Sequence, residues 1–270
     1  MAAVGTLDGK AVVITGAGSG LGRAYALACA AAGASVVVSD VDAAAASSVV
    51  GEIAAAGGSG SAFAGSVDSW DSDRELIEHC VTTFGSLDGL VANAAVRHEA
   101  LPWDEEEAAL RRIAEINILG TQFTVRHAMR QMVESGRGGA ILTVVSGARF
   151  GMHGMSAYGA SKGAVAAMTA AWALEGMPLS IRVNGLSPLA ETTMSLGDTR
   201  ADRPPLPDAG DIAPIVPSLL SDQLRGVTGQ LVRFDGRRLS AYAAPGREDQ
   251  VEERDAWTSA DLVSTLWNWF

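Results

Sequence analysis

A glycine-rich turn near the N-terminus constrains the fold of this chain more than any other feature of the sequence. It lies between an apolar, β-branched run at residues 11–15 and an alanine-rich run at residues 21–32, and reads Thr15-Gly16-Ala17-Gly18-Ser19-Gly20-Leu21-Gly22. Glycines permit a tight turn and let the backbone approach a pyrophosphate, while the following helix offers free N–H groups to the phosphates. A turn of this kind between a strand and a helix predicts a dinucleotide site contacted by Gly16, Gly18, Ser19, Gly20, Leu21 and Gly22.

Short β-branched runs and longer alanine-rich runs alternate along most of the 270 residues. The alternation predicts strands at residues 11–15, 35–39, around Phe63, 87–92, 140–145, 180–187 and 230–234, and helices at 21–32, 42–56, 69–84, 103–135, 156–176 and 212–221. Strands that are almost wholly apolar favour an α/β fold, a Rossmann-like doubly wound parallel sheet with helices on both faces. We expect one dinucleotide-binding domain over residues 1–239, with a mobile loop at 195–210, and a C-terminal extension over 240–270.

The charge balance argues against several classes of partner. The chain has 20 Lys and Arg against 31 Asp and Glu, a net charge of −11, whereas binding to nucleic acid or anionic lipid needs positive charge. No apolar stretch reaches the ~20 residues that cross a bilayer. Two cysteines, Cys29 and Cys80, are too few for a disulfide framework or a four-thiolate zinc site. We therefore expect no nucleic-acid or membrane partner, no metal site, and a cytoplasmic protein with reduced thiols.

Asp40 ends the second predicted strand, roughly 20 residues beyond the glycine-rich turn, where a ribose-binding acid is expected. A carboxylate at this point accepts hydrogen bonds from the ribose 2′-hydroxyl and repels a 2′-phosphate. Positions 19 and 41 are Ser19 and Val41, so no basic residue stands there to neutralise such a phosphate. The predicted cofactor is therefore NAD rather than NADP.

Tyr158 and Lys162 lie four residues apart near the start of a predicted helix, which places them on one face. An ammonium near a phenol favours the phenolate and lowers the pKa of the tyrosine, which is about 10 when unperturbed. Such a tyrosine can give a proton to a carbonyl that is being reduced or take one from an alcohol.

With this pair the chain resembles the short-chain dehydrogenase/reductase family, over about residues 7–239. The resemblance is carried by the glycine-rich turn, the Tyr-x-x-x-Lys pair, Asn93-Ala94, Asn117, Ser146 and the run from Arg182-Val183-Asn184 to Pro188. It implies an enzyme of CH–OH groups with Tyr158 as acid/base, Ser146 orienting the substrate oxygen and Lys162 holding the nicotinamide ribose. Asn117 would connect Lys162 to a proton-relay water.

The same resemblance implies the remaining cofactor contacts. These are Ser66 and Val67 at the adenine, Asn93 and Ala94 beside the first strand, and Tyr158, Lys162, Pro188 and Thr192 around the nicotinamide, with Thr193 as the alternative to Thr192. The chain departs from the family pattern at Ala92, Ser66, Leu189 and Arg237, where the family has Asn, Asp, Gly and Gly. The change at Ser66 predicts a weaker hold on adenine.

A closer resemblance connects the chain with the (3R)-hydroxyacyl-CoA dehydrogenase units of multifunctional enzymes, through the runs at residues 22–27 and 188–194. The expected activity is NAD(H)-dependent interconversion of a small hydrophobic secondary alcohol and its ketone. A 3-hydroxyacyl-CoA dehydrogenase and a non-catalytic dinucleotide-binding sensor are the alternatives. Apolar residues near the catalytic set predict a hydrophobic pocket; they are Phe150, Met152, Met155, Leu189 and Met194.

Two expectations concern assembly. The predicted helices at 103–135 and 156–176 carry apolar residues on more than one side, which predicts a homodimer or homotetramer built on them, as the family resemblance also implies. The apolar positions are Ile113, Ile116, Phe123, Val165, Met168 and Trp172. The C-terminal extension contains Trp257, Trp267, Trp269 and Phe270 and is expected to pack on a protein surface, closing either the pocket or an interface between subunits.

Overall fold

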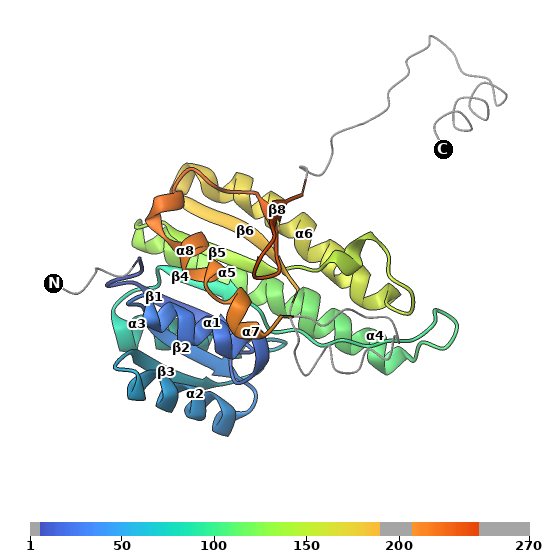
Figure 1. Ribbon diagram of the computed structural model, residues 1–270, viewed down its shortest axis with the longest axis horizontal. Coiled ribbons are helices and arrows are strands. Elements are labelled where there is room, and N and C mark those ends of the chain that lie inside the picture. Colours follow the sequence, from blue (N-terminus) through green and yellow to red (C-terminus); the bar gives the residue numbers. More distant parts are fainter. Residues whose placement is uncertain (1–5, 190–206, 243–270) are drawn as a thin grey trace, which may run out of the picture.

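The computed structural model describes residues 6–189 and 207–242. Eight strands form one sheet in the order β3-β2-β1-β4-β5-β6-β7-β8, and helices cover both of its faces (Figure 1). Seven strands are parallel, and this arrangement is the predicted Rossmann-like, doubly wound α/β fold. The strands are β1 (Ala11–Thr15), β2 (Ser35–Asp40), β3 (Ser59–Ala64), β4 (Gly89–Ala92), β5 (Gly139–Val144), β6 (Ile181–Pro188), β7 (Leu231–Phe234) and β8 (Leu239–Ala241).

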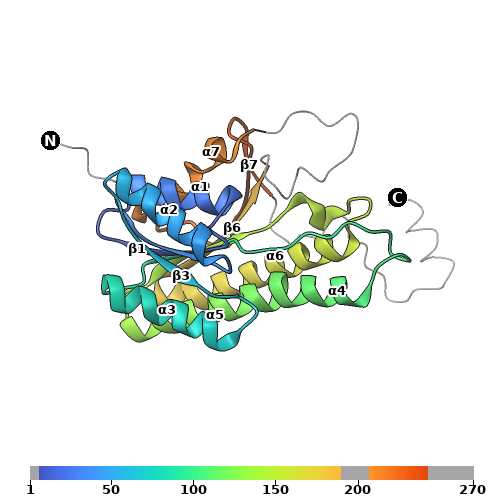
Figure 2. The same ribbon diagram turned by 90° about the horizontal axis from the view of Figure 1, so that it is seen from below.

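The helices form two layers, one on each face of the sheet (Figure 2). One layer contains α1 (Gly20–Ala31), α2 (Ala43–Ala55), α7 (Ala209–Ile212) and α8 (Ile215–Leu220). The other contains α3 (Trp70–Phe84), α4 (Glu107–Ile113), α5 (Thr121–Ser135) and α6 (Ser156–Gly176). Alternate strand residues serve the two cores: Val12 and Ile14 of β1 pack in the first core, and Ala11 and Val13 in the second.

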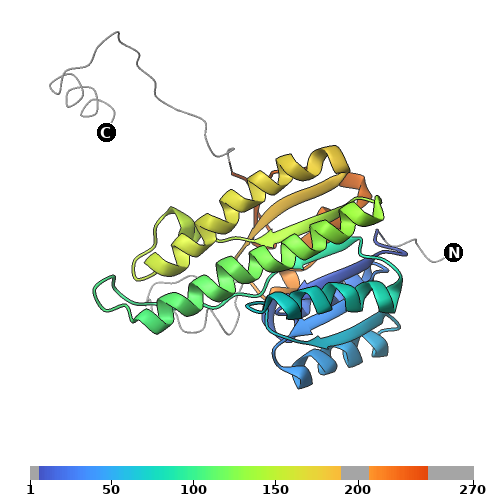
Figure 3. The ribbon, with the colours of Figure 1, turned by 180° about the vertical axis from the view of Figure 1, so that it is seen from behind.

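The predicted long helix at residues 103–135 begins later than expected and changes its winding in the middle. Residues before Glu107 are not helical, and a π-helical segment, η1 (Ala114–Gly120), joins α4 to α5. Figure 3 shows α4–η1–α5 and α6 lying side by side on the same face of the sheet. A π-helical turn is wider than an α-helical one and frequently marks a functional site. Here the widened segment contains Asn117.

Two further differences from the sequence prediction have local causes. The helix predicted at 212–221 is two short helices, α7 and α8, because Pro214 has no N–H with which to continue the hydrogen-bond ladder of α7. The last strand, β8, was not predicted; it pairs antiparallel with β7 through a turn at Asp235 and Gly236. Asp235 Oδ1 accepts from the N–H groups of Arg237 and Arg238, and Gly236 has φ of +84°.

None of the helices in the described part of the chain combines the length and apolar character that a membrane crossing requires. Thr192, Thr193, Met194, most of the loop predicted at 195–210 and the aromatic C-terminal extension beyond residue 242 lie outside the described residues. The predictions made for them remain predictions.

Candidate active site

The glycine-rich turn connects β1 to α1 at the carboxyl edge of the sheet. Gly16 and Gly20 have φ of +61° and +53°, in the left-handed region that favours glycine. At two other positions a side chain would not fit: a Cβ on Gly18 would lie 2.9 Å from Cγ of Asp40, and one on Gly22 would collide with the carbonyl oxygen of Gly16. The turn is therefore packed closely against its neighbours, and it has the form of a cradle for a ligand that approaches the backbone.

Asp40, at the end of β2, is held beside this turn. Its Oδ2 accepts from the N–H of Gly18 at 2.8 Å, and its Oδ1 accepts from the N–H of Asp42 at 3.0 Å. Next to it, the side chain of Val41 is exposed. The structure thus places the predicted ribose acid against the predicted phosphate turn, which it contacts through Oδ2.

Asn93 and Ala94 brace the turn from the neighbouring strand. Thr15 Oγ1 accepts from the N–H groups of both residues, each at 3.1 Å. Asn93 Nδ2 donates to the carbonyl oxygens of Thr15 at 2.9 Å and Gly16 at 3.1 Å. Sequence reasoning proposed Asn93 and Ala94 as cofactor contacts; in the structure their hydrogen bonds fix the shape of the turn, and Thr15, which it did not select, is their common partner.

Ser66 and Val67 follow β3 and meet the long helix. Val67 is buried against Gly120, where an added Cβ would come within 2.6 Å of the valine Cγ2. Hydrogen bonding from Ser66 is the largest contribution holding the pKa of Asp68 below its ordinary value, and Arg112 on α4 pairs with Asp68 at 2.7 Å. A carboxylate is therefore present two residues from the position where the family pattern has one.

The four residues predicted to carry the chemistry converge between β5, η1 and α6. Ser146 follows β5, and its Oγ accepts from the N–H of Ala148 at 3.2 Å. Lys162 is buried on α6, and its Nζ donates to the carbonyl oxygen of Val144 at 2.8 Å and lies 5.7 Å from the centre of the Tyr158 ring. The structure therefore brings the serine, the tyrosine and the lysine together at the carboxyl end of one central strand.

Asn117 connects this group to the neighbouring loop. Its carboxamide is completely buried; Oδ1 accepts from the N–H of Val96 at 2.8 Å, and Nδ2 donates to the carbonyl oxygen of Val96 at 2.9 Å and to Ser161 Oγ at 3.0 Å. Ser161 Oγ in turn donates to the carbonyl oxygen of Tyr158 at 2.7 Å. Ser161 was missed by the sequence analysis, although its place between Tyr158 and Lys162 on the same helix could have drawn attention to it.

Burial controls the electrostatics of this pair. It raises the pKa of Tyr158, and a hydrogen bond with Ser146 and the charge of Arg97 offset only part of that rise. Burial also lowers the pKa of Lys162 to about 8. Sequence reasoning expected the lysine charge to lower the pKa of the tyrosine; in the structure the net direction is opposite, because desolvation of the phenol outweighs the favourable interactions. Each group is thus moved toward its neutral form.

The residues predicted to line a hydrophobic pocket separate into two groups. Met155, the residue before α6, is buried, whereas Phe150 and Met152 are exposed. Arg149 and Phe150 are engaged with the β7–β8 hairpin: the Arg149 guanidinium lies 4.4 Å from the centre of the Phe150 ring and 4.3 Å from that of Tyr242. Their position connects the segment after Ser146 to the end of the described chain.

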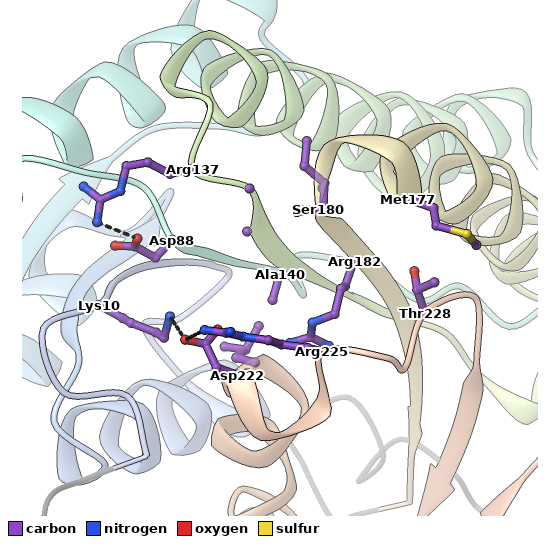
Figure 4. A pocket seen from close by; sticks show the side chains of 14 residues that line it. Lys10, Asp88, Arg137, Ala140, Met177, Ser180, Arg182, Asp222, Arg225 and Thr228 are labelled. Atoms are coloured by element: carbon purple, nitrogen blue, oxygen red, sulfur yellow. Dashed lines mark hydrogen bonds and ion pairs between the residues drawn. The ribbon is translucent and has the colours of Figure 1, made fainter.

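A separate pocket of about 470 Å³ lies at the opposite, amino edge of the sheet (Figure 4). Its charged groups are paired with one another: Lys10 with Asp222 at 3.0 Å and Arg137 with Asp88 at 3.4 Å. Arg182 donates to the carbonyl oxygens of residues 219, 221 and 227. The arginine of the family-like run at 182–188 is therefore a brace of the fold, whereas Pro188 ends β6 at the carboxyl edge, near the site.

The sequence model of the family described as short chain dehydrogenase matches residues 10–204. A cis-4-hydroxycyclohexanecarboxylate dehydrogenase from Sinomonas cyclohexanicum is 36% identical over 240 residues, which cover 84% of this chain and 95% of that protein.

Two solved structures are similar over most of their length. A short chain dehydrogenase from Mycobacterium avium has a TM-score of 0.88 and 32% identity, covering 98% of this chain and 95% of that one. A 7α-hydroxysteroid dehydrogenase complexed with NADH and 7-oxo glycochenodeoxycholic acid has a TM-score of 0.80 and 33% identity, covering 86% and 94%.

Proposed function

Because the chain belongs to the short-chain dehydrogenase/reductase family, we propose that it is an NAD(H)-dependent oxidoreductase that interconverts hydrophobic secondary alcohols and their ketones. The observation that carries the proposal is the convergence of Ser146, Tyr158 and Lys162 at the carboxyl end of β5, with Asn117 tied to the same helix through Ser161. Relatives that oxidise a ring alcohol or bind NADH with a keto steroid support this class of substrate.

The residues present fit a nicotinamide dinucleotide. The closely packed glycine turn leads into the N-terminus of α1, and Asp40 stands beside it for the ribose. Lys162 Nζ has three protons to donate and uses one on Val144, which leaves donors for the nicotinamide ribose. When bound, the dinucleotide supplies the acceptor or donor of a hydride.

The roles of the catalytic residues follow from their protonation. The raised pKa of Tyr158 keeps the phenol protonated at neutral pH, so that it can donate a hydrogen bond and then a proton to the oxygen of a ketone. Ser146, hydrogen-bonded to Tyr158, holds the same oxygen from the other side. Giving up the proton leaves a phenolate, which the charge of Lys162 stabilises. In the direction of alcohol oxidation this phenolate takes the proton of the alcohol and becomes a phenol again.

Asp40 supports NAD rather than NADP as the cofactor. Its two oxygens are held by backbone N–H groups of residues 18 and 42, so the carboxylate has a fixed position beside the turn. A ribose 2′-hydroxyl can donate to this carboxylate, whereas a 2′-phosphate would bring two negative charges together.

Exposed apolar side chains on two helices support a homodimer or homotetramer. Of the apolar positions predicted on more than one side of these helices, Ile113, Ile116 and Val165 are buried within the single chain. Other apolar residues on the same helices are exposed instead, namely Leu110 on α4, Leu119 on η1, Val133 on α5 and Leu174 on α6. Their burial between subunits would stabilise an assembly built on α4–η1–α5 and α6. A monomer in sedimentation at micromolar concentration would contradict it.

The activity is tested with a panel of hydrophobic secondary alcohols, including ring alcohols and a 3-hydroxyacyl-CoA, each with NAD and with NADP. We expect NADH absorbance to rise with at least one ring alcohol, and more rapidly than with the thioester. Faster turnover of the thioester would move the substrate to acyl-CoA. NADH binding without turnover of any compound would contradict the enzymatic proposal and favour a dinucleotide-binding sensor.

A further inference from the structure

Arg97 lies on a loop that is tied at its beginning to the candidate catalytic set. Both backbone groups of the preceding residue, Val96, are hydrogen-bonded to the carboxamide of Asn117, at 2.8 and 2.9 Å. Asn117 reaches Tyr158 through Ser161. The backbone just before Arg97 is therefore held in a fixed position relative to Tyr158.

The same loop is held a second time at Ala100, by the segment that precedes α6. The N–H of Ala100 donates to the carbonyl oxygen of Gly154 at 2.9 Å, and Ala100 forms a parallel bridge with Met155, the residue before α6. Residues 96–100 therefore span from η1 to the start of the helix that presents Tyr158. Arg97 and Glu99 occupy this span.

The guanidinium of Arg97 is largely shielded from solvent on this loop. Its side chain is only 16% exposed, and its charge is one of the causes that lower the pKa of Tyr158 against the effect of burial. The effective dielectric constant around a half-buried cation is lower than at the surface, so the cation attracts an anion more strongly.

Glu99 shows that a carboxylate fits against this guanidinium. Arg97 Nη2 donates to Glu99 Oε2 at 2.7 Å, and the glutamate side chain is 48% exposed. Arginine and carboxylate groups are matched in geometry and charge. An exposed, internal carboxylate two residues away can be exchanged for one brought by a ligand.

We propose that Arg97 is a specificity-determining residue that binds a carboxylate of the substrate, which defines the substrates as hydrophobic secondary alcohols and ketones that carry an acid group. This assignment rests on the proposed function. The substrate carboxylate takes the place of Glu99, while the carbinol oxygen lies at Ser146 and Tyr158. A chain with a net charge of −11 repels anions at long range, so an acid substrate requires a local cation of this kind.

Two substrates that differ by one carboxylate test the assignment. We expect kcat/KM to be roughly tenfold to a hundredfold higher for the cis-3 or the cis-4 isomer of hydroxycyclohexanecarboxylate than for cyclohexanol, as a charged hydrogen bond in a partly buried site would give. Equal or faster turnover of cyclohexanol than of both acids would overturn the role of Arg97 and leave the proposed dehydrogenase activity intact.

Four variants separate charge from fold. Arg97→Gln should remove the preference for the acid, measured as the ratio of its kcat/KM to that of cyclohexanol. Arg97→Lys should retain part of the preference, because the charge remains without the planar fork. Glu99→Gln should lower KM for the acid, since it removes the internal competitor. Arg111→Gln on α4, an equal loss of charge at an exposed site, should change neither. An unchanged preference in Arg97→Gln would overturn the proposal.

A binding measurement keeps the assignment testable without turnover. Cyclohexanecarboxylate and its neutral amide are titrated into the complex of protein and NADH by calorimetry. The acid should bind more tightly than the amide to the original protein and equally to Arg97→Gln. If no alcohol is oxidised but this difference is present, the proposed function fails and the carboxylate site stands; equal binding of acid and amide to the original protein would overturn the site.

Discussion

Charged residues lie at both edges of the sheet, but their surroundings differ. At the amino edge Lys10 is paired with Asp222, and Arg137 with Asp88 (Figure 4). At the carboxyl edge Lys162 is buried, its pKa is lowered to about 8, and burial is the cause. Arg182 at the amino edge is also buried with a lowered pKa, but its guanidinium is bound by three carbonyl oxygens, whereas Lys162 uses one donor on Val144 and has others left for a ligand. We therefore call the amino edge the structural edge and the carboxyl edge the chemical edge.

The largest expected effect comes from removing the phenol at the chemical edge. Tyr158→Phe deletes the proton donor while keeping the ring, so we expect turnover to fall roughly 10²-fold to 10⁴-fold. Binding of NADH, followed by fluorescence, should survive because the glycine turn and Asp40 are untouched. Activity close to that of the original protein would show that another residue is the acid/base.

A buried lysine should make stability depend on pH. The pKa of Lys162 is about 8 in the folded protein and about 10.4 in an unfolded chain, so between these values the unfolded chain binds more protons. The lysine therefore destabilises the cofactor-free protein at pH 7, and this cost fades as the pH rises toward 10.

Lys162→Met removes that dependence. The free energy of unfolding of the original protein, relative to the variant, should rise by roughly 1–3 kcal/mol between pH 7 and pH 10 in urea titrations. Lys10→Met at the amino edge is the matched control. A relative stability of Lys162→Met that is flat with pH would mean that the ammonium is not desolvated.

Asp40 should account for the choice between the two dinucleotides. We expect NAD to be preferred over NADP by about tenfold in kcat/KM, or ~1.4 kcal/mol, through repulsion of the 2′-phosphate and loss of the ribose hydrogen bonds. Asp40→Ala should narrow that ratio. Steady-state kinetics with both cofactors measures it, and equal use of NAD and NADP by the unsubstituted protein would refute the assignment.

The smallest effect is expected at the structural edge. Lys10→Gln breaks the pair with Asp222, whose side chain is 53% exposed, so unfolding should become easier by at most about 1 kcal/mol. Turnover should not change. If Lys10→Gln lost as much activity as Tyr158→Phe, the amino edge could not be called purely structural.

The fold was predictable because most of its signals are local. Apolar β-branched runs and alanine-rich runs differ in composition, and the strand at 11–15 and the helix at 156–176 have the predicted bounds. β8 was missed although Asp235-Gly236 after a strand is a hairpin signal. The π-helical winding around Asn117 was not predictable, since it depends on tertiary bonds such as those to Val96 and Ser161.

The candidate site was predictable to the extent that its residues lie in motifs. Ser146, Tyr158 and Lys162 lie close together in sequence, whereas Asn117 is distant and reaches their helix through its hydrogen bond to Ser161. The predicted direction of the Tyr158 pKa shift was wrong, because the degree of burial cannot be read from residue spacing. Arg97 belongs to no motif; its importance appears only when the fold bridges residues 96–100 to η1 and α6.

At the carboxyl edge of the sheet we expect a hydride to pass directly between a carbinol carbon and a nicotinamide. Oxidation of cyclohexanol, or of a hydroxycyclohexanecarboxylate, deuterated at the carbinol carbon tests it most directly. We predict that the deuterium appears in the reduced dinucleotide, seen by mass spectrometry, and is not exchanged with water. Reduced dinucleotide without deuterium, or ketone formed without reduction of NAD, would show that no direct hydride transfer takes place.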